Sequence, residues 1–204
     1  MVPYFNTSGP CMAGRHFMLP PERRLQRAME LVEQGRYFTL HAGRQTGKTT
    51  SARWLAQYYN SGDQFVALWV DIQVARELDD PALAFRTVFN KLDQWVHLTL
   101  PDLPLNKQRL QWLEDPRTAI QRYLCDLAAR VGRPLVVLFD EVDGLVGETM
   151  VSFLTQLRDG YVARDLSPFP HSVVLIGARQ VRDYIVSAEQ RRALSWLGTT
   201  SPFN

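Results

Sequence analysis

The stretch Tyr37–Thr50, YFTLHAGRQTGKTT, decides how this 204-residue chain folds. It begins with an apolar run suited to a strand, passes through two glycines, and continues after Lys48 in a pattern suited to a helix. A loop between a strand and a helix N-terminus turns backbone N–H groups and the positive end of the helix dipole toward an anion. The stretch therefore predicts a phosphate-binding loop.

The individual residues of the loop suit this task. Gly47 lets the backbone approach a phosphate closely, and Gly43 permits unusual dihedral angles. Lys48 can reach the β- and γ-phosphates of a nucleotide, and the Thr49 hydroxyl can bind Mg²⁺. The strict pattern has glycine where this chain has Ala42, a common and tolerated variant. We expect the phosphates to be bound by Ala42, Gly43, Arg44, Gln45, Thr46, Gly47, Lys48, Thr49 and Thr50.

Strands and helices alternate on both sides of the loop. Apolar runs predict strands over residues 36–41, 65–71, 135–139 and 172–177. Helical spacing predicts helices that begin near Pro20, Lys48, Asp80, Asp115 and residue 148. The strands are apolar throughout, which is typical of a parallel sheet covered by helices on both faces. Residues 101–114, which prolines interrupt, are expected to form a surface excursion.

A second motif, LVVLFDE at residues 135–141, ends the third predicted strand in two carboxylates. In phosphate-loop NTPases a carboxylate at the end of a buried strand holds Mg²⁺ through water, and Asp140 fits that place. Glu141 is positioned to orient and activate the attacking water. Its alternative is a surface carboxylate at a strand end. Asp143 adds a third negative charge or, equally well, caps the loop.

The adjacent Asp140–Glu141 pair favours ATP over GTP. Signalling GTPases place no glutamate there and add an Asp-x-x-Gly motif, which is missing near Asp140. Residues 90–93, NKLD, imitate the guanine-reading motif of those enzymes. However, Leu92 belongs to the apolar face of a predicted helix, and the tetrad precedes the metal-binding strand instead of following it. We interpret the match as coincidence.

Arg179 follows the fourth predicted strand. A polar side chain there lies between the loop and the water-activating carboxylate and could sense the γ-phosphate. Alternatively, Arg179 pairs structurally with Asp183; both interpretations remain open. The predicted catalytic residues are Glu141, Lys48 and Arg179, and the predicted metal ligands are Thr49 and Asp140.

Composition excludes several other classes of protein. A net charge of +2 does not indicate a nucleic-acid partner. Cys11 and Cys125 are too few and too far apart for a disulfide framework or a metal site. The N-terminus does not have the pattern of a secretory signal, and no apolar run approaches the ~20 residues that cross a bilayer. We expect a cytoplasmic protein with reduced thiols and no membrane association.

With these residues in place, the chain resembles a bacterial and archaeal family of AAA-like ATP-binding proteins, related to the AAA+ and STAND groups. The resemblance covers nearly the whole chain and rests on YFNTSGP, HAGRQTGKTT, LVVLFDEVDGL, HSVVLIGARQVRDY and SPFN. It implies a three-layer αβα core of strand order 5-1-4-3-2 that binds ATP or ADP with Mg²⁺. Lys48 and Thr49 match Walker A, and Asp140 and Glu141 match Walker B. Arg179 matches the sensor position, where AAA+ proteins more often have asparagine or threonine.

The resemblance also implies a domain organisation. Residues 1–204 are expected to form one AAA-like ATPase domain, in which residues 1–35 flank the nucleotide site. Family members continue past SPFN with a fifth strand and a helical lid, so both are expected to be missing here. The free edge of the strand at 36–41 would then favour self-association or protein partners.

Three functions are compatible with these motifs. The first is an ATP-binding module that hydrolyses ATP slowly and couples the cycle to movement. The second is a nucleotide-binding switch or scaffold with little or no turnover, and the third is a small-molecule kinase. Glu141 separates the first two, because a hydrolase depends on it. No arginine finger can be assigned, and in this class a neighbouring subunit often supplies it.

Overall fold

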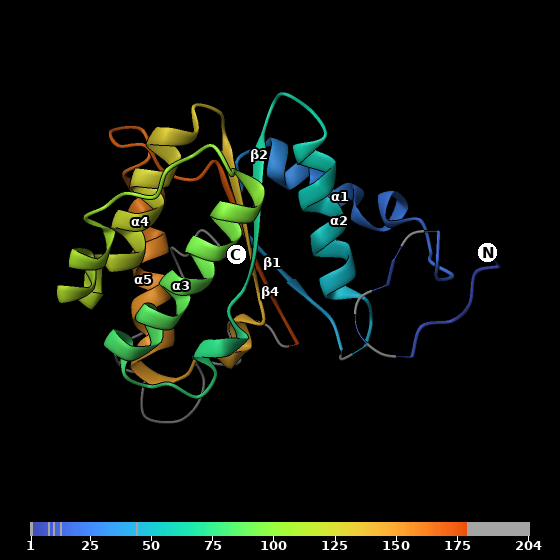
Figure 1. Cartoon of the computed structure of the whole chain (residues 1–204), viewed down its shortest axis with the longest axis horizontal. Coiled ribbons are helices and arrows are strands. Elements are labelled where there is room, and N and C mark those ends of the chain that lie inside the picture. Colours follow the sequence, from blue (N-terminus) through green and yellow to red (C-terminus); the bar gives the residue numbers. More distant parts are fainter. Residues whose placement is uncertain (1, 8, 10, 13, 44, 179–204) are drawn as a thin grey trace.

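A parallel four-stranded sheet forms the centre of the part of the chain that the structure describes (Figure 1). The structure is a computed structural model, and it describes residues 2–178 except 8, 10, 13 and 44. The strands are β1 (Phe38–His41), β2 (Val66–Asp71), β3 (Leu135–Asp140) and β4 (Ser172–Gly177), in the order β1-β4-β3-β2. This order matches the last four positions of the predicted 5-1-4-3-2. The predicted absence of a fifth strand concerns residues outside the described part and stays a prediction.

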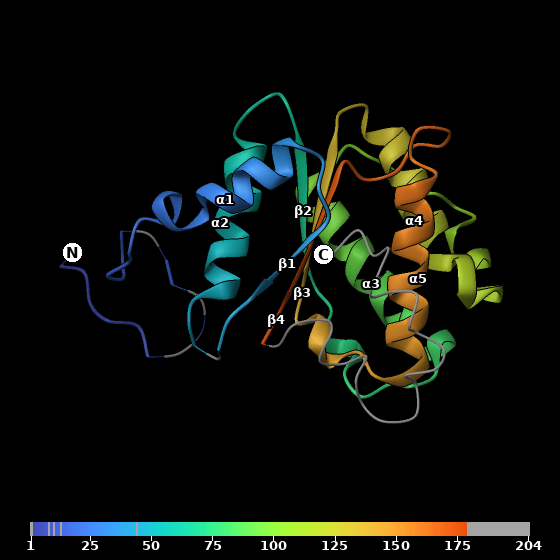
Figure 2. The ribbon, with the colours of Figure 1, turned by 180° about the vertical axis from the view of Figure 1, so that it is seen from behind.

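Helices cover both faces of the sheet, as predicted (Figures 1 and 2). One face carries α1 (Pro21–Glu33) and α2 (Lys48–Asn60). The other carries α3 (Pro81–Thr99), α4 (Pro116–Val131) and α5 (Gly147–Val162). Short 3₁₀ helices occur at η1 (Gln73–Ala75), η2 (Arg109–Glu114) and η3 (Val142–Gly144). The three-layer αβα architecture predicted from the sequence is therefore confirmed.

Local signals explain why the helices begin and end where they do. The Asp80 carboxylate accepts a hydrogen bond from the Ala82 N–H (2.9 Å) at the start of α3. Asp115 does the same for Arg117 (3.2 Å) at the start of α4. In both cases a proline follows the capping aspartate, where its missing N–H costs nothing. Gly132, in the left-handed conformation (φ 71°), ends α4.

The sheet separates two hydrophobic clusters. Along β3, Val137 and Phe139 belong to the larger cluster, which packs against α3, α4 and α5. Val136 and Leu138 face the opposite way and belong to the smaller cluster, under α1 and α2. Both faces of β3 are thus buried, which explains why its sequence is a continuous apolar run instead of an alternating one.

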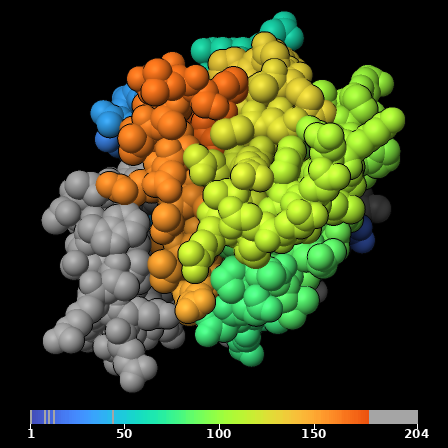
Figure 3. Space-filling model, turned by 90° about the vertical axis from the view of Figure 1, so that its left-hand side faces the viewer, coloured from blue at the N-terminus to red at the C-terminus, as the bar shows by residue number. Residues whose placement is uncertain are grey.

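Residues 101–114 differ in part from the predicted surface excursion. Figure 3 shows this segment in yellow-green on the outer side of the helical layer. Its Leu113 is nevertheless buried in the larger cluster, against which Leu103 and Leu105 also pack. Asp93 of α3 accepts hydrogen bonds from the Arg109 guanidinium (2.8 Å) and from the Tyr123 hydroxyl (2.8 Å). The prediction was wrong here because these leucines follow no helical or strand period.

Candidate nucleotide-binding site

In the loop between β1 and α2, backbone carbonyl groups bind the side chain of Lys48. The Lys48 ammonium donates hydrogen bonds to the carbonyl oxygens of Ala42 (2.8 Å) and Gly43 (2.7 Å). The Thr46 hydroxyl also donates to Gly43 (2.8 Å). Gly47, the residue before α2, has φ 81°, a conformation that favours glycine. The loop therefore has the curvature of an anion-binding cradle, with the helix N-terminus at its end.

Two segments from the N-terminal part of the chain contact this loop. The Arg24 guanidinium of α1 donates to the Thr46 carbonyl (3.1 Å). The backbone N–H of Cys11 donates to the Thr50 hydroxyl (3.0 Å), and Gly9 lines the same pocket as the loop. These contacts place α1 and the residues before it beside the phosphate loop.

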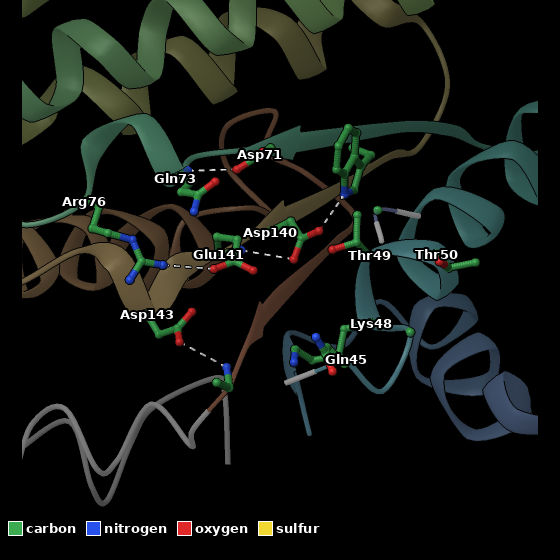
Figure 4. A pocket seen from close by; sticks show the side chains of 14 residues that line it. Gln45, Lys48, Thr49, Thr50, Asp71, Gln73, Arg76, Asp140, Glu141 and Asp143 are labelled. Carbon is green, nitrogen blue, oxygen red and sulfur yellow. Dashed lines mark hydrogen bonds and ion pairs between the residues drawn. The ribbon is translucent and has the colours of Figure 1, made fainter. Parts of the chain in front are cut away.

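Asp140 lies at the end of β3, next to the loop residue Thr49. The residue is 1% exposed, and its carboxylate accepts hydrogen bonds from the Trp69 indole (3.2 Å) and from the Glu141 N–H (3.0 Å). Figure 4 shows it beside the Thr49 side chain. Burial raises the pKa of Asp140, and the hydrogen bonds from Thr49 and Trp69 oppose that rise. The groups that lower the pKa of Asp140 are hydrogen-bond donors, not side-chain cations. A cationic ligand would therefore stabilise the buried negative charge.

Glu141 follows directly and points toward a different partner. Its carboxylate forms an ion pair with the Arg76 guanidinium (3.1 Å), which comes from the segment after η1 (Figure 4). Its backbone has φ 61°, a strained conformation for a residue with a side chain. Burial raises the pKa of Glu141, the negative charges of Asp143 and Asp140 add to the rise, and Arg76 opposes it. A strained backbone and a raised pKa are features that active-site carboxylates share, and they make Glu141 a candidate functional residue.

Asp143 links the loop after β3 to the end of β4. One carboxylate oxygen accepts a hydrogen bond from the Ala178 N–H (3.2 Å). The other is buried and has no hydrogen-bond partner among the described residues. A Cβ on Gly177 would lie 3.1 Å from that oxygen, so the glycine allows the close approach. Asp143 thus bonds to the end of β4, as a residue that caps the loop would, and it also lines the pocket, where it could add a negative charge.

These groups surround a single pocket of about 730 Å³ at the carboxyl ends of the strands. This is the place where parallel α/β sheets bind ligands, and the size is typical of a small-molecule site. Its lining residues are Gly9, Gln45, Gly47, Lys48, Thr49, Thr50, Trp69, Asp71, Gln73, Arg76, Asp140, Glu141, Asp143 and Ala178.

Most of the predicted site residues meet here. Ala42, Gly43 and Thr46 belong to the same loop without lining the pocket. Arg44 and Arg179 lie outside the described residues. Their roles, including the alternative pairing of Arg179 with Asp183, stay predictions.

Sequence reasoning missed four residues that line the pocket: Trp69, Asp71, Gln73 and Arg76. Asp71 carried a usable signal, because it ends an apolar strand just as Asp140 does, and the two are paired in register. Arg76 carried none. A 3₁₀ turn after β2 brings it back to the pocket, and such turns have no clear sequence period.

The guanine-like tetrad at residues 90–93 lies within α3, away from the pocket lining. Its aspartate, Asp93, bonds to Arg109 and Tyr123. These contacts belong to the packing of α3 against the next segment, which supports the interpretation of the tetrad as coincidence.

The oxygen groups of Thr49 and Asp140 fit a magnesium ion that also binds phosphates. Mg²⁺ prefers oxygen ligands and is usually held by one or two carboxylates together with phosphates and water. Within the described residues no group of three or more His, Cys, Asp or Glu side chains could hold a metal ion alone. A magnesium ion at this site would be held by Thr49 and Asp140 together with phosphate oxygens.

Comparison with known proteins agrees with the geometry. No helix in the described part is long and apolar enough to cross a membrane. No curated protein is similar enough to the chain to match it. The sequence model of a family described as an AAA domain matches residues 32–185, well over half of the chain. Those residues contain the phosphate loop, both carboxylates and every strand described above, and the chain belongs to this family of AAA-like phosphate-loop nucleotide-binding proteins.

Proposed function

We propose that this AAA-domain protein binds ATP and ADP with Mg²⁺ in the pocket and slowly hydrolyses the bond between the β- and γ-phosphates of ATP. The observation that carries the proposal is the arrangement of the pocket. Lys48 and Thr49 of the phosphate loop line the same pocket as Asp140 and Glu141 at the end of β3.

Each side chain has a distinct task. The loop N–H groups and the Lys48 ammonium bind phosphate oxygens, so Lys48 must exchange its present bonds to Ala42 and Gly43 for bonds to the nucleotide. Thr49 would hold Mg²⁺ directly and Asp140 would hold it through water. Mg²⁺ supplies neutralisation of phosphate charge when it is bound. Glu141 orients the attacking water and accepts its proton.

Calorimetric titration with ATP, ADP and GTP, with and without Mg²⁺, tests the binding part of the proposal. We expect ATP and ADP to bind more tightly than GTP. Lys48→Ala should weaken binding by about 1.5–3 kcal/mol through loss of a charge-assisted hydrogen bond. Lys107→Ala, at an exposed lysine away from the pocket, is the matched control and should bind normally. Unchanged affinity in Lys48→Ala would refute the assignment of the loop.

The second candidate function is a nucleotide-dependent switch or scaffold with little or no turnover. One observation favours it: the Glu141 carboxylate already forms an ion pair with the Arg76 guanidinium. If the ion pair holds Glu141 away from the water, Arg76→Ala should raise the rate of phosphate release. If the ion pair orients Glu141 for hydrolysis, the same variant should lower it. Phosphate release by Arg76→Ala and the parent at saturating ATP therefore distinguishes the two functions.

A further inference from the structure

Trp69 donates a hydrogen bond to the aspartate that the proposed function assigns to magnesium. In the sheet, Trp69 of β2 is paired in register with Leu138, whereas Asp140 is paired with Asp71. The indole therefore reaches along the sheet toward the end of the strands, where its Nε1 lies 3.2 Å from Asp140 Oδ2. An indole N–H is a donor without acceptor capacity, so it favours the ionised carboxylate.

Packing fixes the direction of this N–H group. The Trp95 ring of α3 contacts the Trp69 ring edge-to-face, with centroids 4.5 Å apart and planes at 78°. The Arg53 guanidinium of α2 lies 5.5 Å from the centre of the same ring. Aromatic and cation–π contacts of this kind restrict rotation of the ring. The indole is thus held from two helices while it donates to Asp140.

The other donors to Asp140 differ in kind. Thr49 is itself a proposed metal ligand, and the remaining donor is the backbone N–H of Glu141. Trp69 is the side chain whose donor can be removed without removing a proposed ligand.

We propose that Trp69 is a positioning residue for magnesium binding, acting through Asp140. Its N–H group holds Oδ2 and thereby turns the remaining lone pairs of the carboxylate toward Thr49 and the phosphate loop. Partners of groups that bind a metal directly typically change metal affinity 10- to 100-fold, and for Asp140, which acts through water, we expect the lower end of that range. The inference rests on the proposed function, because it needs Mg²⁺ at Asp140.

The test measures how strongly Mg²⁺ supports nucleotide binding, independently of turnover. ADP affinity is determined by calorimetry with Mg²⁺ and with a chelator, and the ratio of the two dissociation constants is compared between variants. Trp69→Phe should reduce the ratio by about tenfold. Because Trp69 lines the pocket, the ratio is the quantity compared, and neither ADP affinity is compared alone. Trp112→Phe is the matched control, since Trp112 packs against Tyr123 and does not line the pocket, and it should keep the parental ratio.

A second replacement separates the hydrogen bond from the packing. In Trp69→3-benzothienylalanine a sulfur atom takes the place of the N–H group, and the ring keeps its shape. The inference predicts the same loss of magnesium support as in Trp69→Phe. A parental ratio in this variant would overturn it and assign Trp69 a packing role.

Asp140→Asn distinguishes failure of the inference from failure of the proposed function. If Asp140→Asn abolishes magnesium support while both Trp69 variants keep it, the inference is wrong and the proposed metal site stands. If Asp140→Asn leaves the ratio unchanged, or if the parent binds no ADP, both are wrong.

Discussion

Burial of the Asp140 carboxylate lowers the stability of the protein when the carboxylate is ionised, because the charge loses contact with water. A carboxyl group whose pKa is raised by folding contributes stability that is fully present below its ordinary value of 3.8 and is lost as the pH rises through the higher pKa of the folded state. Ionisation above that range is what the site needs for a cation. The cost in stability and the proposed binding of magnesium would therefore have the same origin, the buried negative charge.

We predict that the stability of Asp140→Asn relative to the parent increases with pH, because the asparagine does not ionise. The comparison is between melting temperatures without nucleotide at several pH values from just above 3.8 to neutral. A difference that stays constant across this range would show that burial of Asp140 carries no such cost. The same substitution should weaken Mg²⁺-dependent ADP binding.

Glu141→Gln should bind ATP almost as the parent does and release no phosphate. The amide keeps the shape of the side chain but cannot accept a proton from water. Phosphate release and calorimetric binding are measured on the same preparation. Glu148→Gln is the matched control, since Glu148 is exposed and does not line the pocket. Hydrolysis at the parental rate by Glu141→Gln would move the water-activating role to another group.

Among the elements, the start of α5 is joined to the segment after β2. The Asp79 carboxylate accepts a hydrogen bond from the Glu148 N–H (2.7 Å), which satisfies one of the free donors of the helix end. A Cβ on Gly147 would lie 1.7 Å from the same oxygen. The Glu77 N–H also bonds to the Gly144 carbonyl (2.9 Å). These contacts hold the segment that carries Arg76 against the loop that carries Glu141.

Gly147→Ala should destabilise the protein more than Gly132→Ala does. Both glycines have positive φ, 51° and 71°, so each alanine meets a backbone penalty of about 1–2 kcal/mol. Gly132 has open space where the Cβ would lie, whereas Gly147 has the Asp79 carboxylate. The steric overlap between the new Cβ at position 147 and the Asp79 carboxylate should lower the free energy of unfolding by a further ~1–3 kcal/mol. Urea unfolding of the two variants measures the difference, and equal losses would mean that the contact relaxes freely.

Elements with strong local signals could be predicted from the sequence. The starts of α3 and α4 follow from an aspartate and a proline in succession, and β3 follows from an apolar run that ends in carboxylates. The phosphate loop and the Asp140–Glu141 pair were found in the same way. Trp69 and Arg76 were not, because their approach to the pocket depends on sheet register and on a 3₁₀ turn. Contacts that depend on sheet register or on a 3₁₀ turn produce no repeating pattern of apolar residues in the local sequence.

At the scale of the whole molecule, β1 is the outermost strand of the sheet that the described residues form. Its residues are in register with β4, from Phe38 opposite Val174 to His41 opposite Gly177. No strand of the described part pairs with its other edge. An unpaired strand edge is a template for association with another chain.

We predict that the 204-residue chain self-associates in a concentration-dependent way through this edge. Light scattering over a tenfold or greater range of concentration measures the mass. Thr39→Lys places a charge on the half-buried middle of β1 and should shift the equilibrium toward monomer. A parent chain that is monomeric at every concentration and melts cooperatively would refute this prediction.

The division of the core by the sheet has a consequence for local opening. Among the described residues, the cluster under α1 and α2 is the smaller of the two, and it supports the layer that carries the phosphate loop. Regions with fewer buried apolar contacts open at lower free-energy cost and exchange their amide protons sooner. Nucleotide bound at the N-terminus of α2 would oppose that opening. Amide exchange of α1 and α2 should therefore slow as ADP is added, while the layer of α3, α4 and α5 stays protected throughout.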